Sequence, residues 1–141
     1  MDYQEASDTV VQLVNEALDA GLDGKERPEP FGVGPKPCTD NLIGPTGEVS
    51  PDFGYAFPYT ALGIDSTTFA EQATATWRAK DMRITSLDRP GIFRRFAVSE
   101  DGFRFSLTIN EEIDQISIGG SGPCVDPPDE LTGSESLVEP D

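Results

Sequence analysis

Histidine is absent from the 141 residues of this chain, and that absence excludes several kinds of active site. Without an imidazole base, neither a Ser-His-Asp triad nor a Cys-His nucleophile pair is possible. Histidine-ligated zinc and copper sites are excluded as well. The two cysteines, Cys38 and Cys124, are too few for a four-cysteine zinc site or an iron–sulfur cluster. We therefore predict no metal and no cofactor, and any acid–base catalysis would depend on Asp, Glu, Lys or Tyr.

Basic residues are also scarce, because 10 Lys and Arg stand against 26 Asp and Glu and give a formal net charge of −16. Duplex nucleic acid and anionic membrane surfaces both favour Lys and Arg, so we expect neither as a partner. No apolar run approaches the roughly 20 residues of a membrane-spanning helix, so we predict no transmembrane segment in this chain. The polar start Met1–Glu5 does not resemble a signal peptide.

Hydrophobic periodicity predicts two helices. Apolar residues recur at three- and four-residue steps over 4–20, and Gly21 follows the last of them, where it suits a left-handed C-terminal cap. A second helix is predicted over 66–80, with Asp65 or Ser66 as its N-terminal cap. The residues predicted on the inner side of this second helix are Phe69, Ala73, Thr76, Trp77 and Lys80.

The proline-rich stretch 21–51, which follows the first helix, is predicted to be mostly loop.

Alternation of apolar and polar residues predicts strands in the rest of the chain, most clearly over 103–110. Asp101-Gly102 predicts a two-residue hairpin turn that pairs Val98 with Phe105. The predicted strands cover residues 53–62, 82–87, 91–99, 103–110 and 113–119.

The order of these elements predicts an α+β fold. We expect a two-layer sandwich, in which an antiparallel sheet of four to five strands is packed by two helices. Residues 1–125 should form a single domain. Residues 126–141 are acidic, contain three prolines and lack an apolar pattern, so we predict a disordered tail there.

Both cysteines lie in segments rich in proline and glycine. Cys38 ends the run Pro-Lys-Pro-Cys, and Cys124 ends the run Gly-Pro-Cys after the last predicted strand. Free structural cysteines are usually buried, so we predict a disulfide between these two. It would tie the long loop to the sheet and stabilise the fold by about 4–5 kcal/mol. A disulfide favours an extracytoplasmic location, and the alternative is two free thiols in a reducing cytosol.

The layout resembles that of small secreted proteins and lipoproteins of actinobacteria. The matching pieces are the apolar stripe over 6–18, Cys38, the aromatic run Tyr55–Tyr59, Trp77 and the ending Gly122-Pro123-Cys124. The resemblance implies an α+β fold and a secreted or cell-envelope location, reached after removal of a signal sequence. Members of this family often carry a lipid-modified cysteine upstream, so a lipid anchor before this segment is possible in the natural protein.

Basic residues are concentrated in one segment, since seven of the ten lie between 78 and 104. Alternation in the predicted hairpin places Arg95 and Arg104 on the solvent face and Arg94 toward the core near its rim. Guanidinium groups in such a patch suit a carboxylate, a phosphate or an acidic partner. The simpler interpretation is that these arginines pair with the chain's own acidic residues.

Two further groups of residues are candidates for a site. Tyr55, Tyr59 and Trp77 would suit an aromatic ligand pocket, although a chain this small also needs aromatic residues for its core. Glu111 and Glu112 are adjacent carboxylates of the kind that act as acid and base in some enzymes, although a solvated acidic turn is the simpler interpretation.

We therefore predict a non-enzymatic, extracytoplasmic binding module, with an unknown protein or a small anionic ligand as its partner. Its binding residues would be Arg94, Arg95, Arg104, Tyr55, Tyr59 and Trp77. One alternative is an acidic inhibitor or immunity-type protein that blocks a basic site on its target. A further alternative is a small enzyme that depends on carboxylates.

Overall fold

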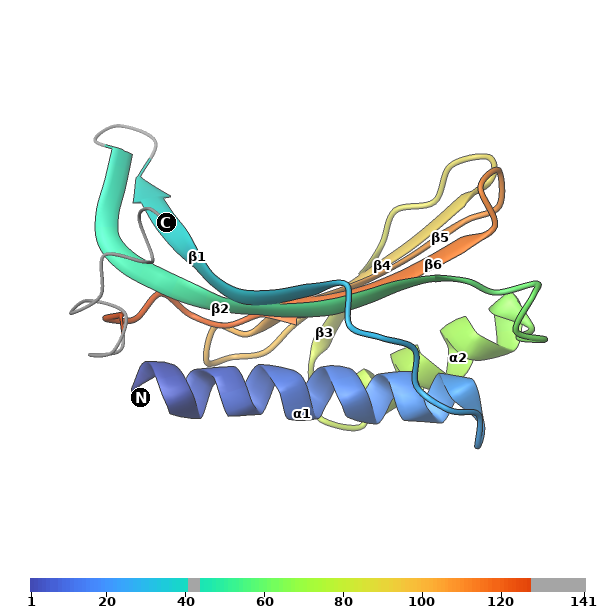
Figure 1. Ribbon diagram of the computed structural model, residues 1–141, viewed down its shortest axis with the longest axis horizontal. Coiled ribbons are helices and arrows are strands. Elements are labelled where there is room, and N and C mark those ends of the chain that lie inside the picture. Colours follow the sequence, from blue (N-terminus) through green and yellow to red (C-terminus); the bar gives the residue numbers. More distant parts are fainter. Residues whose placement is uncertain (41–43, 128–141) are drawn as a thin grey trace.

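The computed structural model describes residues 1–40 and 44–127, apart from the side chains of residues 40 and 44–46. In this part of the chain six strands form one antiparallel sheet, and two helices cover one of its faces (Figure 1). None of the described helices is long and apolar enough to cross a membrane. The elements are α1 (Tyr3–Leu22), β1 (Gly32–Asp40), β2 (Gly44–Pro58), α2 (Ser66–Arg78), β3 (Arg83–Ser86), β4 (Ile92–Val98), β5 (Arg104–Asn110) and β6 (Gln115–Ser121).

The sheet joins two pieces that are separate in the sequence. Its strand order is β1-β2-β6-β5-β4-β3, and every neighbouring pair is antiparallel. Strands β3 to β6 form a meander, whereas β1 and β2 form a hairpin that pairs with the meander through β2 and β6. The predicted α+β class, antiparallel sheet and two helices are therefore confirmed. The predicted number of strands was too low, since the described part of the sheet has six.

The additional strand lies in residues 21–51, which we predicted to be mostly loop. That prediction was wrong, because β1 and the first part of β2 occupy residues 32–40 and 44–51. Pro35 lies on β1 opposite Pro51 on β2. An edge strand such as β1 tolerates proline, because one side of its backbone has no partner strand that needs an N–H donor.

Helix α1 confirms the predicted apolar stripe and corrects its end. Asp2 caps the helix, accepting a hydrogen bond of 2.8 Å at Oδ1 from the backbone N of Glu5. The helix continues past Gly21 to Leu22, and its C-terminal cap is Asp23, which adopts the left-handed conformation predicted for the glycine. A Cβ on Gly21 would lie 2.5 Å from the ring of Phe69, so this glycine permits close packing of the two helices. The buried residues of the helix are Ala6, Val10, Val14, Ala17, Leu18, Gly21 and Leu22.

Helix α2 packs beside α1 and carries the largest buried side chain, Trp77. The Trp77 ring lies 5.7 Å from the ring of Phe105 on β5, centroid to centroid. Two residues predicted on the inner side of α2 are not part of the core, since Lys80 is exposed and Thr76 is only half-buried. Their places are taken by other residues, so that the buried set of α2 is Phe69, Ala70, Ala73, Thr74 and Trp77.

The β4–β5 hairpin differs from the prediction by one residue in register. The connection is a longer loop, in which the backbone N of Ser99 donates to the carbonyl O of Phe103 at 2.9 Å. Phe105 therefore lies opposite Ala97, and the predicted pairing of Phe105 with Val98 is wrong. A slip of one residue moves every side chain of a strand to the other face of the sheet. Phe96 consequently lies on the face away from the helices, where it is 36% exposed.

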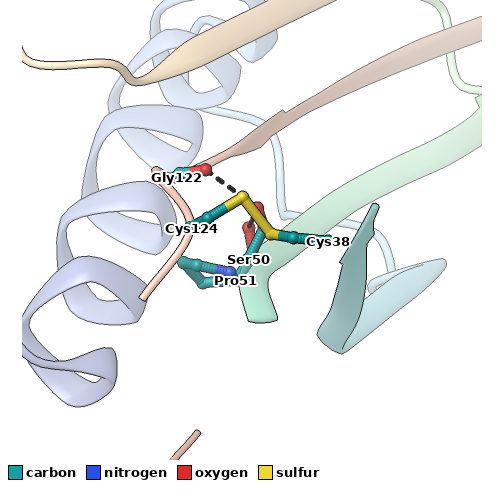
Figure 2. Close-up of a disulfide and its surroundings, with 5 residues drawn as sticks. All are labelled: Cys38, Ser50, Pro51, Gly122 and Cys124. Atoms are coloured by element: carbon teal, nitrogen blue, oxygen red, sulfur yellow. Dashed lines mark hydrogen bonds between the residues drawn. A yellow bond between two sulfur atoms is a disulfide. The ribbon is translucent and has the colours of Figure 1, made fainter. Parts of the chain in front are cut away.

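The predicted disulfide between Cys38 and Cys124 is confirmed. It links β1 to the segment that follows β6, as Figure 2 shows. Hydrogen bonds hold the same segment beside β2, because the backbones of Val49 and Val125 exchange two bonds of 2.8 Å. Ser50 Oγ also donates to the carbonyl O of Gly122 at 2.8 Å. The structure therefore ties the far end of the β1–β2 hairpin to the end of the meander. Most of the predicted tail, from residue 128 on, lies outside the described residues.

Candidate functional site

The face of the sheet that the helices leave open is the first candidate site. Figure 1 shows the sheet bending away from the helices at both ends, which makes this face concave. The groove along it has a volume of about 720 Å³. Because alternate residues of each strand face the helices, the residues between them face the groove. Those with side chains in the groove by this alternation include Asp52, Ala56, Phe96, Arg104, Ser106, Gln115, Ser117 and Ser121.

The middle of this face is almost bare backbone. Gly54 on β2 lies directly opposite Gly119 on β6. A Cβ on Gly119 would lie 2.9 Å from the carbonyl O of Phe53, and one on Gly54 would lie 3.1 Å from the carbonyl O of Ile118. The two strands approach so closely here that only glycine fits without a shift of the backbone. A partner lying across this part of the groove would therefore contact main chain and small side chains.

One half of the face is basic. The register places Arg83 of β3, Val98 of β4 and Arg104 of β5 in one row across the sheet. Phe96 lies in the next row and Arg94, opposite Thr108, in the row after that. We call this region, made by Arg83, Arg94, Phe96 and Arg104, the basic half.

The arginines of the basic half are not neutralised by the part of the chain that the structure describes. None of them forms an ion pair with a described acidic residue. Asp52 of β2 lies in the same row as Arg104, with Ser121 of β6 between them, and it is paired with Lys36 at 3.4 Å. The expectation that the arginines pair with the chain's own acids is therefore wrong for Arg94 and Arg104 within the described residues.

The predicted arrangement of the three arginines is also wrong. Arg94, predicted toward the core, shares the open face with Arg104, whereas Arg95 lies on the helix-facing side opposite Leu107. The cause is the longer β4–β5 loop, which shifts the register by one residue and exchanges the two faces of β4.

Arg95 is held in place by its own neighbours. Its guanidinium carbon lies 3.7 Å from the centroid of the Phe93 ring, a cation–π contact. Its Nη1 donates to Asp88 Oδ1 and to the carbonyl O of Arg94, both at 2.7 Å. The hydrogen bond from Arg95 holds the pKa of the Asp88 carboxyl below its ordinary value, and a bond from the Arg94 backbone N adds to the effect. Arg95 therefore does not belong to the basic half.

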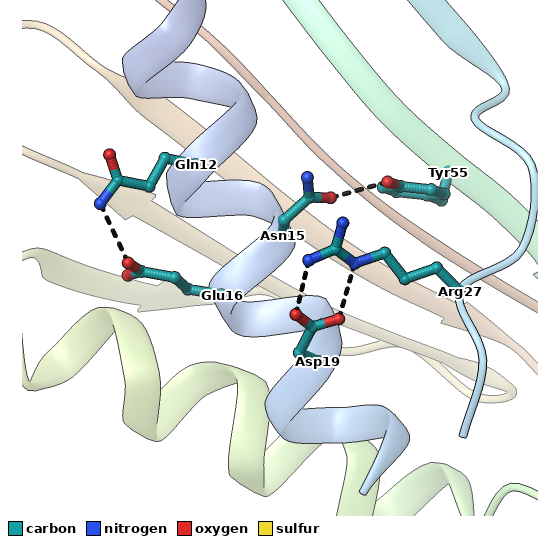
Figure 3. A network of polar contacts seen from close by, with 6 residues as sticks. All are labelled: Gln12, Asn15, Glu16, Asp19, Arg27 and Tyr55. Carbon is teal, nitrogen blue, oxygen red and sulfur yellow. Dashed lines mark hydrogen bonds and ion pairs between the residues drawn. The ribbon is translucent and has the colours of Figure 1, made fainter. Parts of the chain in front are cut away.

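The aromatic candidates belong to the core rather than to a surface. Trp77 is fully buried, Tyr55 is 5% exposed, and Tyr59 is partly buried against the same core. The Tyr55 hydroxyl donates to Asn15 Oδ1 at 2.7 Å, and burial raises the pKa of this hydroxyl (Figure 3). Tyr55, Tyr59 and Trp77 are therefore core residues, which is the simpler of the two interpretations of the sequence.

The acidic candidates do not form a closed pair. Glu111 and Glu112 lie, exposed, in the turn between β5 and β6. Asp114, in the same turn, accepts a hydrogen bond from the backbone N of Thr60 at 3.2 Å. The described residues contain no group of three or more acidic or cysteine side chains placed to hold a metal ion.

Sequence reasoning did not single out Phe96 and Gly119 as site residues, because their place on the open face depends on the register and on strand β2.

Comparisons with protein-family models, with curated proteins and with solved structures find no match for this chain. The resemblance to actinobacterial secreted proteins therefore stays a prediction.

Proposed function

We propose that this protein is a non-enzymatic binding module that holds an acidic segment of a partner protein on the concave face of its sheet. The observation that carries this proposal is the basic half, where three arginines without a described acidic partner surround an exposed phenylalanine in a chain of net charge −16. Guanidinium groups bind carboxylates through paired, charge-assisted hydrogen bonds.

The charge distribution would orient an acidic segment on the protein as well as attract it. An acidic segment is repelled by most of this protein, and the basic half is the place where attraction exceeds repulsion. The small side chains and bare backbone around Gly54 and Gly119 leave room for an extended chain to continue along the groove. Phe96 offers an apolar contact between the charged rows.

We also propose that the module works outside the cytoplasm, as a secreted or cell-envelope protein with a signal sequence upstream. The disulfide Cys38–Cys124 supports this location, because such bonds persist in oxidising compartments.

Charge reversal tests the site. The probe is a fluorescein-labelled hexaglutamate peptide, with labelled hexaglutamine as the neutral control, in a fluorescence anisotropy titration at low ionic strength. Arg94→Glu and Arg104→Glu should each weaken hexaglutamate binding about tenfold or more, since a hydrogen bond to a charged group contributes about 1.5–3 kcal/mol.

Lys25→Glu is the matched control, because it makes the same change of charge at an exposed position outside the groove. Binding that is weakened equally by Lys25→Glu would show that net charge alone governs affinity. Equal binding of hexaglutamine, or no effect of Arg94→Glu and Arg104→Glu, would refute the proposal.

A further inference from the structure

A second cleft lies on the opposite side of the sheet from the basic half. It opens between α2 and strands β4 and β5 and has a volume of about 370 Å³, at the small end of the range for ligand sites. Phe93 and Arg95 of β4 and Ile109 of β5 line it from the sheet. The other lining residues come from α2 and from the turn after β5, and they are Ser66, Thr67, Ala70, Glu71, Thr74, Arg78 and Glu111.

Thr74 is the unusual residue of this cleft. Its side chain is 6% exposed, it is the one buried polar residue found in the described part of the chain, and its Oγ1 has no hydrogen-bond partner there. Two other helical threonines, Thr76 and Thr9, donate to the carbonyl O four residues earlier, at 3.0 and 2.9 Å. A buried hydroxyl without a partner destabilises a fold, and valine would fill the same space without that cost. The hydroxyl of Thr74 therefore points to a partner that binds in the cleft.

The charged residues of the cleft carry both signs. Arg95 is fixed by Asp88 and Phe93, so its guanidinium is already oriented. Arg78 is exposed at the end of α2 and forms no ion pair with any described acidic residue. Glu71 and Glu111 are exposed carboxylates on the same cleft. A ligand that carried negative charge alone would be repelled by these two groups.

We propose that this cleft binds a small zwitterion with an apolar side chain, such as a free apolar amino acid. Arg78 and Arg95 would donate hydrogen bonds to the carboxylate, and Glu71 and Glu111 would accept hydrogen bonds from the ammonium group. The apolar side chain would lie against Phe93 and its neighbours on the sheet. This site is separate from the basic half and does not depend on the function proposed above.

Three related probes test each part of the assignment. L-phenylalanine carries both charges, L-phenylalaninamide lacks the carboxylate, and hydrocinnamate lacks the ammonium group. In a titration followed by amide NMR, L-phenylalanine should shift the resonances of Thr74 and Ile109, and each of the other two should bind about tenfold more weakly. If none of the three shifts these resonances at millimolar concentration, or if hydrocinnamate binds as tightly as L-phenylalanine, the proposal is wrong.

Variants of the protein separate binding from folding. Thr74→Val should leave the melting temperature unchanged or higher without ligand, and should weaken L-phenylalanine binding about tenfold. A lower melting temperature would show that the hydroxyl serves the fold, and unchanged binding would show that it does not meet the ligand, so either result counts against the proposal.

Arg78→Gln should weaken binding of L-phenylalanine, whereas Lys25→Gln, with the same loss of charge outside the cleft, should not. Arg104→Glu, which alters the basic half, should leave it unchanged as well. Equal effects of Arg78→Gln and Lys25→Gln would overturn the assigned role of Arg78. These results do not depend on hexaglutamate binding, so failure of one proposal is distinguishable from failure of the other.

Discussion

Removal of the disulfide should cost this protein a large part of its stability. The bond joins residues 86 positions apart, so in its absence the unfolded chain regains the entropy of a long closed loop. For a loop of this length the chain-entropy model gives about 4.5 kcal/mol at 25 °C. In a domain of this size that loss corresponds to a decrease of roughly 15 °C in melting temperature. The variant to examine is the double replacement Cys38→Ala with Cys124→Ala, which leaves no reactive thiol.

The assay is equilibrium unfolding in urea, with the midpoint and the m-value compared between the wild type and the double variant. Ser50→Ala is the local control, because it removes the 2.8 Å hydrogen bond to Gly122 beside the disulfide and leaves the covalent link intact (Figure 2). We expect this control to lose only about 1 kcal/mol. If the double variant also stays within about 1 kcal/mol of the wild type, the loop-entropy explanation is wrong. Alkylation of both cysteines in the untreated folded protein would contradict the bond itself.

Two further changes test the close approach of β2 to β6 and a surface ion pair. Gly119→Ala should destabilise the protein by about 1–3 kcal/mol in urea unfolding, because the new Cβ would lie 2.9 Å from the Phe53 carbonyl O. The control Ser117→Ala, on the same strand and face, should stay within about 0.5 kcal/mol of the wild type. Equal losses of stability in the two variants would contradict the steric reason. Hydrogen bonds of 2.7 and 2.8 Å from Arg27 lower the pKa of Asp19 below its ordinary 3.8, so the pair stabilises the fold above that pH and loses its effect as the pH falls through the lowered value (Figure 3). Asp19→Asn should therefore be less stable than the wild type by a few tenths of a kcal/mol to about 1 at pH 7, since both side chains are half exposed. This difference should shrink as the pH falls through the lowered pKa of Asp19, and a difference that did not change with pH would refute this cause.

The parts of the fold that the sequence predicted correctly are those set by local pattern. The apolar stripe of α1 and the strict alternation of β5 each bury one face, and that periodicity alone identifies them. The disulfide was predictable for a different reason. Two cysteines in Pro/Gly-rich segments of a chain without histidine have few alternatives.

The parts that could not be predicted depend on pairing between distant segments. The prolines of β1 indicate loop when the sequence is read locally, and they are compatible with a strand only because β1 lies at the sheet edge beside β2. The β4–β5 register depends on how Ser99 and Phe103 close the loop, which the dipeptide Asp101-Gly102 does not determine. This shift of one residue in the β4–β5 register determines which arginines lie on the open face.

The charge pattern of the chain can be interpreted only together with the register of β4 and β5. Seven of the ten basic residues lie within 78–104, and the alternation of β4 places two of them, Arg94 and Arg95, on opposite faces of the sheet. Arg94 lies on the open face of the sheet without a described acidic partner, whereas its neighbour Arg95 is fixed by Asp88 and Phe93 on the side of α2. An open, uncompensated cation suits a partner that supplies many carboxylates along an extended chain. A cation fixed in a small cleft that also contains carboxylates suits one small molecule of mixed charge. Two adjacent residues of the same type therefore support two different kinds of recognition.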